Sequence, residues 1–362
     1  IVRRVLMRAI RVLIATGGTA GHIVPALSVA DALRESGCEV EFLGGDRAEA
    51  QLVPAAGYRL HQINASGLSR TSRIAAFKAA LKTLPAVRSA RRVVREFKPD
   101  VVLGGGGYMG GIGGIAGISK RIPVVLTEAD SHMGLSNRIL ARFASRVCLA
   151  FPIEGRGSDR YVVTGRPVPA AATDRSSARK RFGIANDSLC VLVTGGSLGA
   201  RSINEAAVVA FKDADFEVLH LAGIRDLDSL AAPRDAYHLE GYVDRFGEAV
   251  LACDLAVARA GGSVFELAAH GCPALLIPYP YAAGDHQTGN ARWMEQAGAA
   301  RVISDADLTP ELLARQVDEI VSDPARLKAM SAASAALARP NAARDVADQL
   351  IASAAVVRGQ AD

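Results

Sequence analysis

The sequence predicts an α/β protein built from two doubly wound parallel sheets, each in its own domain. Two observations predict this class. Short apolar runs alternate with longer stretches whose apolar residues recur at helical spacing, and this alternation builds a parallel sheet with helices on both faces. The pattern also starts twice, because an apolar run followed by Thr-Gly-Gly and a helix occurs at residues 10–36 and again from residue 188. A chain of 362 residues has room for two such domains.

In the first half, the expected strands cover residues 10–15, 39–43, 59–63, 100–103, 123–126, 146–149 and 161–163. The expected helices lie near residues 23–36, 47–56, 73–96, 108–119 and 134–144. The uncharged stretch 101–118 is rich in glycine. We therefore expect a strand, a glycine turn and a helix there rather than a membrane span.

A linker is expected at residues 165–170, because Pro167 and Pro169 disfavour regular structure on both sides. The first domain then covers residues 1–164 and the second covers residues 171–340. In the second domain the expected strands are 188–193, 216–221, 236–240, 254–258, 273–277 and 300–303. The final segment, 341–362, contains a helix with no strand after it, so this helix can pack back on the first domain.

Charge is distributed unevenly along the chain. Residues 1–165 contain 23 Lys and Arg against 12 Asp and Glu, whereas the remaining residues contain 19 against 25. A basic half indicates an anionic partner, either a nucleic acid or a membrane surface. Aromatic residues make up only 5% of the chain. This disfavours a nucleic-acid partner, because few aromatic side chains are present on which bases could stack.

A basic amphipathic helix is expected within residues 66–98. Apolar residues recur there at helical spacing, and Glu96 is the one acid. The basic residues are Arg70, Arg73, Lys78, Lys82, Arg88, Arg91, Arg92, Arg95 and Lys98. This pattern is typical of helices that lie on an anionic membrane, although a solvated helix with an inward apolar face has the same pattern.

Cysteine and acid spacing argue against a tightly bound metal. The five cysteines lie far apart without a C-x-x-C pair, which disfavours a zinc site or a disulfide framework and favours a reducing compartment. Three D-x-D triplets begin at Asp213, Asp226 and Asp305, in polar stretches outside the glycine turns. We expect no metal or organic cofactor, and leave open only a loosely bound divalent cation. No signal peptide is expected, because only a short apolar run follows the basic start.

Four glycine-rich turns follow apolar runs, at residues 17–22, 104–114, 195–199 and 261–263. Ligands of doubly wound sheets bind at the carboxyl ends of the strands, so one ligand cleft would explain this shared placement. Glycine lets the backbone approach a ligand, and a helix start favours an anion. A dinucleotide motif is disfavoured because Thr16 occupies the position of its first glycine, and no Walker G-K-[ST] sequence is present.

Several polar side chains in or near these turns are candidates for proton transfer or for binding sugar hydroxyls. His22 and Glu128 follow two strands of the first half and are both expected to face the cleft as candidate general bases. His22 has the ordinary pKa better suited to proton transfer near neutrality. In the second half, Glu266 can accept hydrogen bonds from a ribose diol, and Gln287 belongs to an amide-rich cluster suited to sugar hydroxyls.

Together these segments resemble the MurG family of glycosyltransferases, over nearly the whole chain. The matching motifs are Gly17-Gly18-Thr19-Ala20-Gly21-His22, Gly106-Gly107-Tyr108, Glu128 with Gly134-Leu135-Ser136-Asn137, Gly196-Ser197-Leu198-Gly199-Ala200-Arg201, Arg259-Ala260-Gly261 with Glu266, and Asp285-His286-Gln287. The resemblance implies a GT-B architecture, in which two Rossmann-like domains face one another across a cleft.

The activity that the resemblance implies is an inverting transfer of N-acetylglucosamine from UDP-GlcNAc. The implied acceptor is the 4-hydroxyl of N-acetylmuramic acid in lipid I, which would give lipid II for peptidoglycan synthesis, and hence for cell shape and division. The implied location is the cytoplasmic face of the plasma membrane, as a peripheral protein without nucleic acid.

The resemblance also implies roles for individual residues. His22 is the implied base, with Glu128 as the second catalytic residue. The implied contacts to UDP-GlcNAc are Thr19, Ala20, Gly21, Asp130, Arg166, Ser197, Val243 through its backbone, Gly262, Ser263, Val264, Glu266, His286 and Gln287. The implied acceptor-side residues are Gly106, Gly107, Tyr108 and Asn137. The family usually has an arginine where this chain has Pro169, so it stays open whether Arg166 replaces it.

Three alternatives remain at the level of sequence. One is another GT-B transferase acting on a different lipid or natural product. The second is a UDP-GlcNAc epimerase of the same architecture, and the third is a non-catalytic module that binds a membrane or nucleic acid. Turnover of UDP-GlcNAc with and without an acceptor separates them.

Overall fold

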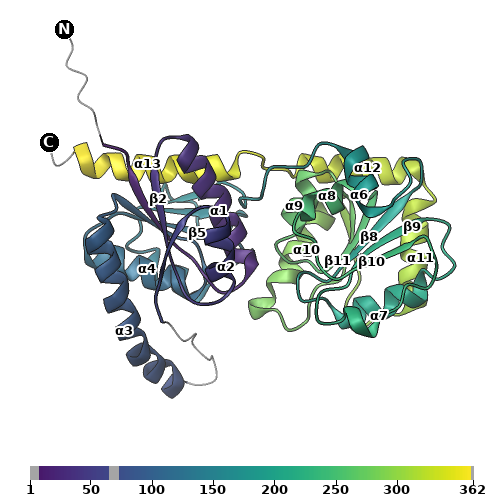
Figure 1. Cartoon of the computed structure of the whole chain (residues 1–362), viewed down its shortest axis with the longest axis horizontal. Coiled ribbons are helices and arrows are strands. Elements are labelled where there is room, and N and C mark those ends of the chain that lie inside the picture. The colour runs from purple at the N-terminus through teal and green to yellow at the C-terminus, as the bar shows by residue number, and fades with distance from the viewer. Residues whose placement is uncertain (1–7, 65–72, 360–362) are drawn as a thin grey trace, which may run out of the picture. The chain divides into compact units, whose positions relative to one another are not determined.

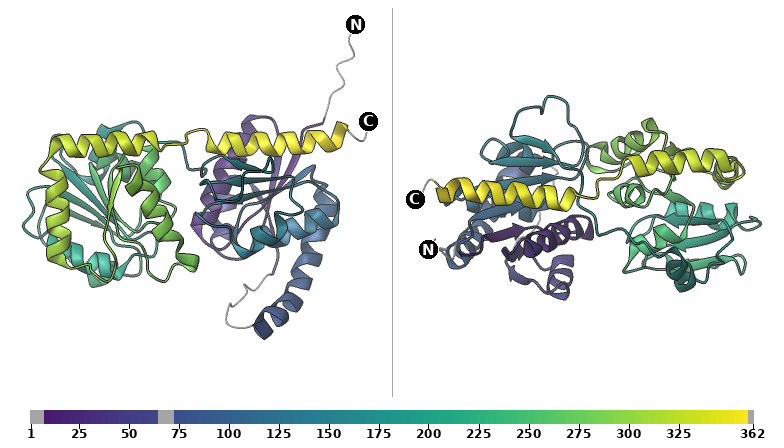
Figure 2. Two further views of the ribbon diagram at one scale, coloured as in Figure 1. Left: turned by 180° about the vertical axis from the view of Figure 1, so that it is seen from behind. Right: turned by 90° about the horizontal axis from the view of Figure 1, so that it is seen from above.

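The computed structural model describes residues 8–64 and 73–359, except for the side chains of residues 73–83, 283 and 357–359. The chain divides into two compact units, Ile1–Val168 with Asn341–Asp362, and Pro169–Pro340. Each unit contains one parallel sheet with helices on both of its faces (Figures 1 and 2). The predicted fold class is therefore confirmed.

The first unit is organised around a parallel sheet in the order β3-β2-β1-β4-β5-β6-β7. Its strands are β1 (Arg11–Ala15), β2 (Glu39–Gly44), β3 (Arg59–Gln62), β4 (Val101–Gly104), β5 (Val124–Glu128), β6 (Arg146–Leu149) and β7 (Tyr161–Val163). The order reverses between β1 and β4, which pair with Ala15 opposite Gly104. The first two glycine-rich turns therefore leave the sheet side by side, at the position where doubly wound folds bind ligands.

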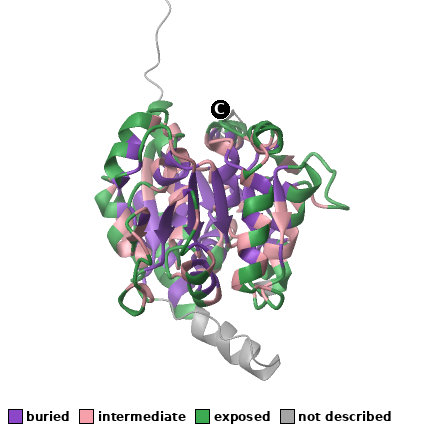
Figure 3. Ribbon diagram, turned by 90° about the vertical axis from the view of Figure 1, so that its right-hand side faces the viewer, coloured by how far each residue is buried: buried purple, intermediate pink, exposed green. Residues whose placement is uncertain are grey.

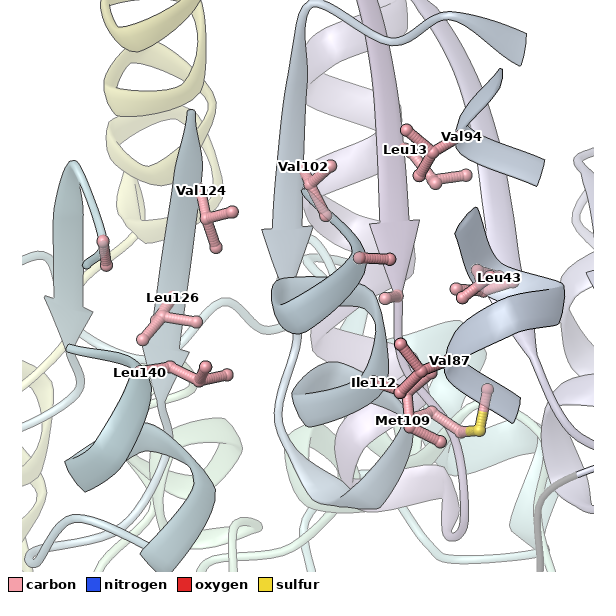
Figure 4. Packing of buried hydrophobic residues seen from close by; sticks show 14 of the residues in the cluster. Leu13, Leu43, Val87, Val94, Val102, Met109, Ile112, Val124, Leu126 and Leu140 are labelled. Carbon is pink, nitrogen blue, oxygen red and sulfur yellow. The ribbon is translucent and has the colours of Figure 1, made fainter. Parts of the chain in front are cut away.

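Helices cover this sheet on both faces. They are α1 (Ala20–Glu35), α2 (Ala48–Ala55), α3 (Arg73–Phe97), α4 (Gly107–Ser119), α5 (Leu135–Leu140) and α13 (Ala342–Gly359). One apolar cluster joins the sheet to α3, α4 and α5 (Figure 4), and another joins it to α1, α2 and α13. In both units the central strands are largely buried, whereas the outer sides of the helices are exposed (Figure 3).

The glycine-rich stretch 101–118 forms β4 and α4, as predicted. Its glycines let α4 lie directly on the sheet. A Cβ at Gly113 would overlap the Cβ of Ala15, and one at Gly117 would lie 2.9 Å from Val124. Within the described residues, no helix is both long enough and apolar enough to cross a membrane.

The last helix, α13, belongs to the first unit. Val346, Ala347 and Leu350 are fully buried in the cluster that also contains Ile23 and Val29 of α1. The chain thus returns to the first unit after completing the second. The sequence pattern was compatible with this packing but did not require it.

The second unit has a parallel sheet in the order β10-β9-β8-β11-β12-β13. Its strands are β8 (Cys190–Thr194), β9 (Glu217–Leu221), β10 (Tyr237–Glu240), β11 (Leu255–Ala258), β12 (Ala274–Leu276) and β13 (Ala300–Val302). Its helices are α6 (Arg175–Phe182), α7 (Arg201–Ala210), α8 (Phe246–Ala252), α9 (Val264–Ala269), α10 (His286–Gln296), α11 (Pro310–Val321) and α12 (Pro324–Ala336), with 3-10 turns η1 (Leu227–Ser229) and η2 (Ala283–Asp285). The order reverses between β8 and β11, so the turns at 195–199 and 261–263 are neighbours.

The predicted basic helix exists as α3. Arg70 and the side chains of Arg73, Lys78 and Lys82 lie outside the described residues. From Leu84 onward the side chains are described, and Ala86, Ala90 and Val94 face the core. The helix is therefore amphipathic over its described part.

Candidate active site

His22 lies at the start of α1, against the turn that follows β4. A Cβ at Gly106 would lie 2.9 Å from His22 Nδ1, and one at Gly107 would lie 3.5 Å from His22 Cδ2. Both glycines also have positive φ angles, 85° and 66°, which favour glycine. The glycines therefore make room for the imidazole, and the predicted base and two predicted acceptor-side residues come together.

Glu128 is buried at the end of β5. One carboxylate oxygen accepts hydrogen bonds from Gly134 N at 2.8 Å and from Asn137 Nδ2 at 3.0 Å. Asn137 Nδ2 also lies 2.9 Å from the Thr127 carbonyl oxygen. These hydrogen bonds of Glu128 and Asn137 connect the two ends of the loop that contains Asp130.

Burial raises the pKa of Glu128 above its ordinary value, and the hydrogen bonds from Asn137 and Gly134 partly oppose this shift. The hydrogen bonds from Gly134 and Asn137 satisfy one oxygen of the buried carboxylate. The expected cleft-facing position of Glu128 and its catalytic assignment stay predictions.

Arg166 is also buried and joins two of the predicted site segments. Its Nη2 donates to the Gly21 carbonyl oxygen at 2.5 Å, and its Nη1 lies 3.5 Å from the Ala129 carbonyl oxygen. The guanidinium therefore ties the start of α1, and with it His22, to the loop after β5. A role at the substrate diphosphate stays a prediction.

In the second unit, the loop between β8 and α7 packs tightly on its neighbours. A Cβ at Gly199 would overlap the Ala222 carbonyl oxygen, and Gly223 approaches Gly199 equally closely. Ser197 is exposed at the outer side of this loop, just before the start of α7. Such a position suits an anion, because helix starts present unpaired N–H groups.

Glu266 lies in the first turn of α9, next to the turn 261–263. Val264 and Val243 are both buried. The backbone contact predicted for Val243 stays a prediction. Gly262 and Ser263 are partly exposed in the same turn, so the ribose-binding candidates share one edge of the sheet.

The start of α10 is fixed against this turn. Gln287 Oε1 accepts a hydrogen bond from Tyr279 N at 2.9 Å, and Asn290 Nδ2 donates to the Ala260 carbonyl oxygen at 3.0 Å. A Cβ at Gly261 would lie 3.9 Å from Gln287 Nε2. Gln287 is thus brought next to the turn 261–263, which leads into α9 and Glu266. The sugar-binding roles of His286 and Gln287 stay predictions.

Arg259 has a structural role that the sequence did not reveal. Its Nη1 pairs with Asp305 at 2.6 Å, and its Nη2 donates to Ser202 Oγ at 2.9 Å. Asp305 belongs to one of the D-x-D triplets, and Asp226 of another accepts from Asn204. Among the residues with described side chains, no group of three or more His, Cys, Asp and Glu could hold a metal ion.

A buried polar network supports the loop after β9. His220 is fully buried, with Nδ1 2.8 Å from Tyr237 Oη and Nε2 3.0 Å from Asn204 Oδ1. Asn204 Nδ2 donates to the Ala222 carbonyl oxygen, so Asn204 Oδ1 accepts and the His220 proton lies on Nε2. This network ends at Ala222, beside Gly199.

We expect the second unit to lose stability as the pH falls from about 6.5 toward 4. Burial lowers the pKa of His220 to about 4. The unfolded chain therefore binds a proton in this window that the folded unit does not, and His220 contributes a loss of about 1.4 kcal/mol per pH unit. Urea unfolding followed by tryptophan fluorescence measures this slope, and His220→Gln should lower it. An unchanged slope in the variant would assign the pH dependence to other groups.

Two family descriptions match this chain in sequence. Residues 12–149 match the Glycosyltransferase family 28 N-terminal domain, and residues 190–350 match its C-terminal domain. A relative from Halothermothrix orenii is 34% identical over 90% of this chain and 94% of its own length. One from Pseudomonas fluorescens is 40% identical over 92% and 96%. Both are named UDP-N-acetylglucosamine–N-acetylmuramyl-(pentapeptide) pyrophosphoryl-undecaprenol N-acetylglucosamine transferase.

The crystal structure of Acinetobacter baumannii MurG superposes with a TM-score of 0.75, at 30% identity, over 94% of this chain and 99% of that one. The chain belongs to the MurG family. The calicheamicin glycosyltransferase CalG4 (16% identity, TM-score 0.71) and the UDP-GlcNAc 2-epimerase of Neisseria meningitidis (15%, 0.66) share the fold. At such identities the likeness to these two proteins extends to the fold alone.

Membership of the MurG family confirms the resemblance drawn from the motifs. Arg166 and Glu128 were predicted to be site residues, but their internal hydrogen bonds were not foreseen. The buried carboxylate of Glu49, which accepts hydrogen bonds from Gly18 N and Gly45 N, was not foreseen either. The one signal that could have indicated it is the pair Gly44-Gly45 at the end of a strand, since adjacent glycines there suggest that something approaches closely.

Proposed function

We propose that this chain transfers N-acetylglucosamine from UDP-GlcNAc to lipid I, the undecaprenyl-pyrophosphoryl N-acetylmuramyl pentapeptide. One observation carries the proposal: relatives named for this reaction align with more than 90% of both chains. The distant likeness to epimerases and natural-product transferases does not support an alternative activity, because a shared fold does not imply a shared function.

His22 has the role of general base in this proposal. The 4-hydroxyl oxygen of the acceptor sugar attacks the anomeric carbon of N-acetylglucosamine, and its proton passes to the His22 imidazole. The bond from the anomeric carbon to the diphosphate oxygen breaks, and its electron pair leaves with UDP. Attack from the side opposite the leaving group inverts the anomeric configuration. The packing of Gly106 and Gly107 around the ring supports the choice of His22.

The donor is proposed to bind the loops at the carboxyl ends of β8, β11 and β12. Ser197 and the start of α7 would hold the diphosphate, Glu266 the ribose and Gln287 the sugar hydroxyls. The supporting observation is that Glu266, Gln287 and the turn 261–263 belong to one edge of the sheet. The donor contacts of Thr19, Ala20 and Gly21 stay a prediction.

Incubation with UDP-GlcNAc, with and without a lipid I analogue, tests the proposal. UDP release only in the presence of lipid I is the expected result. Turnover without any acceptor would point to an epimerase, and turnover with another lipid alone would point to a different transferase. No turnover, together with salt-sensitive binding to liposomes or RNA, would indicate a binding module.

We further infer that the first unit binds the cytoplasmic surface of an anionic membrane. Leu135, Ile139 and Phe143 recur every four residues along α5 and the turn after it, and they are 66%, 56% and 66% exposed. We call these three residues the α5 apolar stripe. Exposed Arg138 and Arg142 lie between them in the sequence. Exposed apolar side chains next to arginines suit the interface of an anionic bilayer.

Replacing Ile139 and Phe143 by serine is expected to weaken binding to anionic vesicles by about tenfold or more, since both side chains would lose burial in the bilayer. Vesicle co-sedimentation measures the affinity, and activity on a water-soluble acceptor analogue should not change. Val209→Ser is the matched control, because Val209 is 51% exposed on α7 of the other unit. Equal vesicle affinity of the double variant and the parent protein would assign membrane binding elsewhere.

A further inference from the structure

Glu49 is a buried carboxylate beneath the first glycine-rich turn. It lies near the start of α2 and is only 1% exposed. A buried acidic side chain is costly unless its oxygens accept hydrogen bonds. The hydrogen-bond donors to the Glu49 carboxylate therefore indicate its role.

The two carboxylate oxygens hold two neighbouring strand ends together. Oε2 accepts from Gly18 N at 2.9 Å, just after β1, and Oε1 accepts from Gly45 N at 2.8 Å, just after β2. Hydrogen bonds from backbone N–H groups to a carboxylate are among the stronger ones in proteins. Glu49 thus fixes the Gly17-Gly18 turn to the rest of the sheet edge.

Three glycines leave space for this carboxyl group. A Cβ at Gly17 would lie 2.5 Å from Glu49 Oε1, one at Gly45 would lie 3.0 Å from the same oxygen, and one at Gly44 would lie 2.9 Å from Glu49 Cγ. Gly17, Gly44 and Gly45 are therefore needed around Glu49, so part of the glycine content of this edge serves an internal contact.

The turn held by Glu49 leads directly into the helix that carries His22. Gly18 has a φ of 109° and donates its N–H to Glu49, and Thr19 is the N-cap of α1. The His22 N–H donates to the Thr19 carbonyl oxygen at 3.0 Å. A change in the Gly18 peptide would therefore displace the start of α1.

We propose that Glu49 is a positioning residue for catalysis, which sets the place of His22 through the Gly17-Gly18 turn. The proposal rests on the proposed role of His22 as the base.

The test is Glu49→Gln, alone and combined with His22→Ala. An amide has one acceptor oxygen, so one of the two backbone N–H groups would face the amide NH2 group. We expect kcat to fall by about 10- to 100-fold, with KM for UDP-GlcNAc changed by less than about threefold. In the His22→Ala background, Glu49→Gln should lower kcat by less than about threefold, because the two residues act as a unit. Glu35→Gln, on the exposed end of α1, is the control.

Additive losses in the double variant, or full activity of Glu49→Gln, would overturn the proposal. Amide hydrogen exchange at Gly18 and Gly45 gives a readout independent of turnover, and Glu49→Gln should speed exchange at one or both. If His22→Ala keeps full activity, the base assignment fails, and unchanged exchange at both amides would show that Glu49 does not hold the turn either. Glu49→Asp, which keeps both oxygens on a shorter stem, should restore part of kcat and replaces Glu49→Gln if that variant does not fold.

Discussion

Replacing His22 with alanine is expected to lower kcat by about 10²- to 10⁴-fold, the usual contribution of a general base, while UDP binding changes by less than about twofold. The reason is that the acceptor hydroxyl loses the group that takes its proton, whereas the proposed nucleotide contacts belong to the other unit. Steady-state UDP release with a lipid I analogue measures kcat, and calorimetry with UDP measures the affinity.

The control for this variant is another histidine that makes only internal contacts. His238 Nε2 lies 2.8 Å from Glu217 Oε2, between β10 and β9, and glutamine can preserve a hydrogen bond there. His238→Gln should keep kcat within about twofold. Parent-like turnover of His22→Ala would remove His22 from the mechanism, and loss of UDP affinity would indicate a folding defect instead.

Gly199→Ala is expected to have the largest effect on stability, with a loss of more than about 3 kcal/mol and of UDP binding. Its φ is 81°, and an added Cβ would overlap the backbone carbonyl oxygen of Ala222, which a side-chain rotation cannot relieve. The loop before α7 would have to move away from the loop after β9. Because that loop is the proposed diphosphate site, nucleotide affinity should fall with stability.

Gly196→Ala separates steric overlap from backbone strain in the same loop. Gly196 also has a positive φ, 89°, but no atom lies within 4 Å of the position of its Cβ. This variant should cost about 1–2 kcal/mol, the ordinary penalty of a left-handed alanine. Equal losses of unfolding free energy in the two alanine variants would show that the backbone near Ala222 moves to accommodate the added Cβ at little cost.

The chain provides its own probe for these measurements. Trp293 is the one tryptophan in the sequence, and it stacks on Phe265 of α9 with ring centroids 5.0 Å apart. Its fluorescence therefore reports unfolding of the second unit. Urea titrations of the parent protein, Gly196→Ala and Gly199→Ala followed in this way compare the free energy of unfolding of the same unit.

Local pattern was sufficient to predict most elements and the edge of each sheet that carries the site. Buried parallel strands are short apolar runs, and their helices have apolar residues at helical spacing, so β1, α4 and β8 follow from neighbouring residues alone. The same holds for the placement of His22, Ser197 and Glu266, because each lies in or just after the turn that follows a parallel strand, and such turns lie at the carboxyl edge of the sheet.

Tertiary structure alone decided which groups the site residues contact. Arg166 reaches the Gly21 carbonyl oxygen across 145 positions of sequence, and Glu49 reaches Gly18 across 31. The packing of α13 on the first unit is likewise a contact between segments far apart in the sequence. Periodicity constrains residues a few positions apart, whereas these contacts depend on how distant loops meet around buried polar groups that must be hydrogen-bonded. For that reason the sequence determined the fold class, the family and the positions of the candidate residues along the chain. Only the folded chain revealed that Glu128 is buried and that Glu49 accepts hydrogen bonds from the first glycine loop.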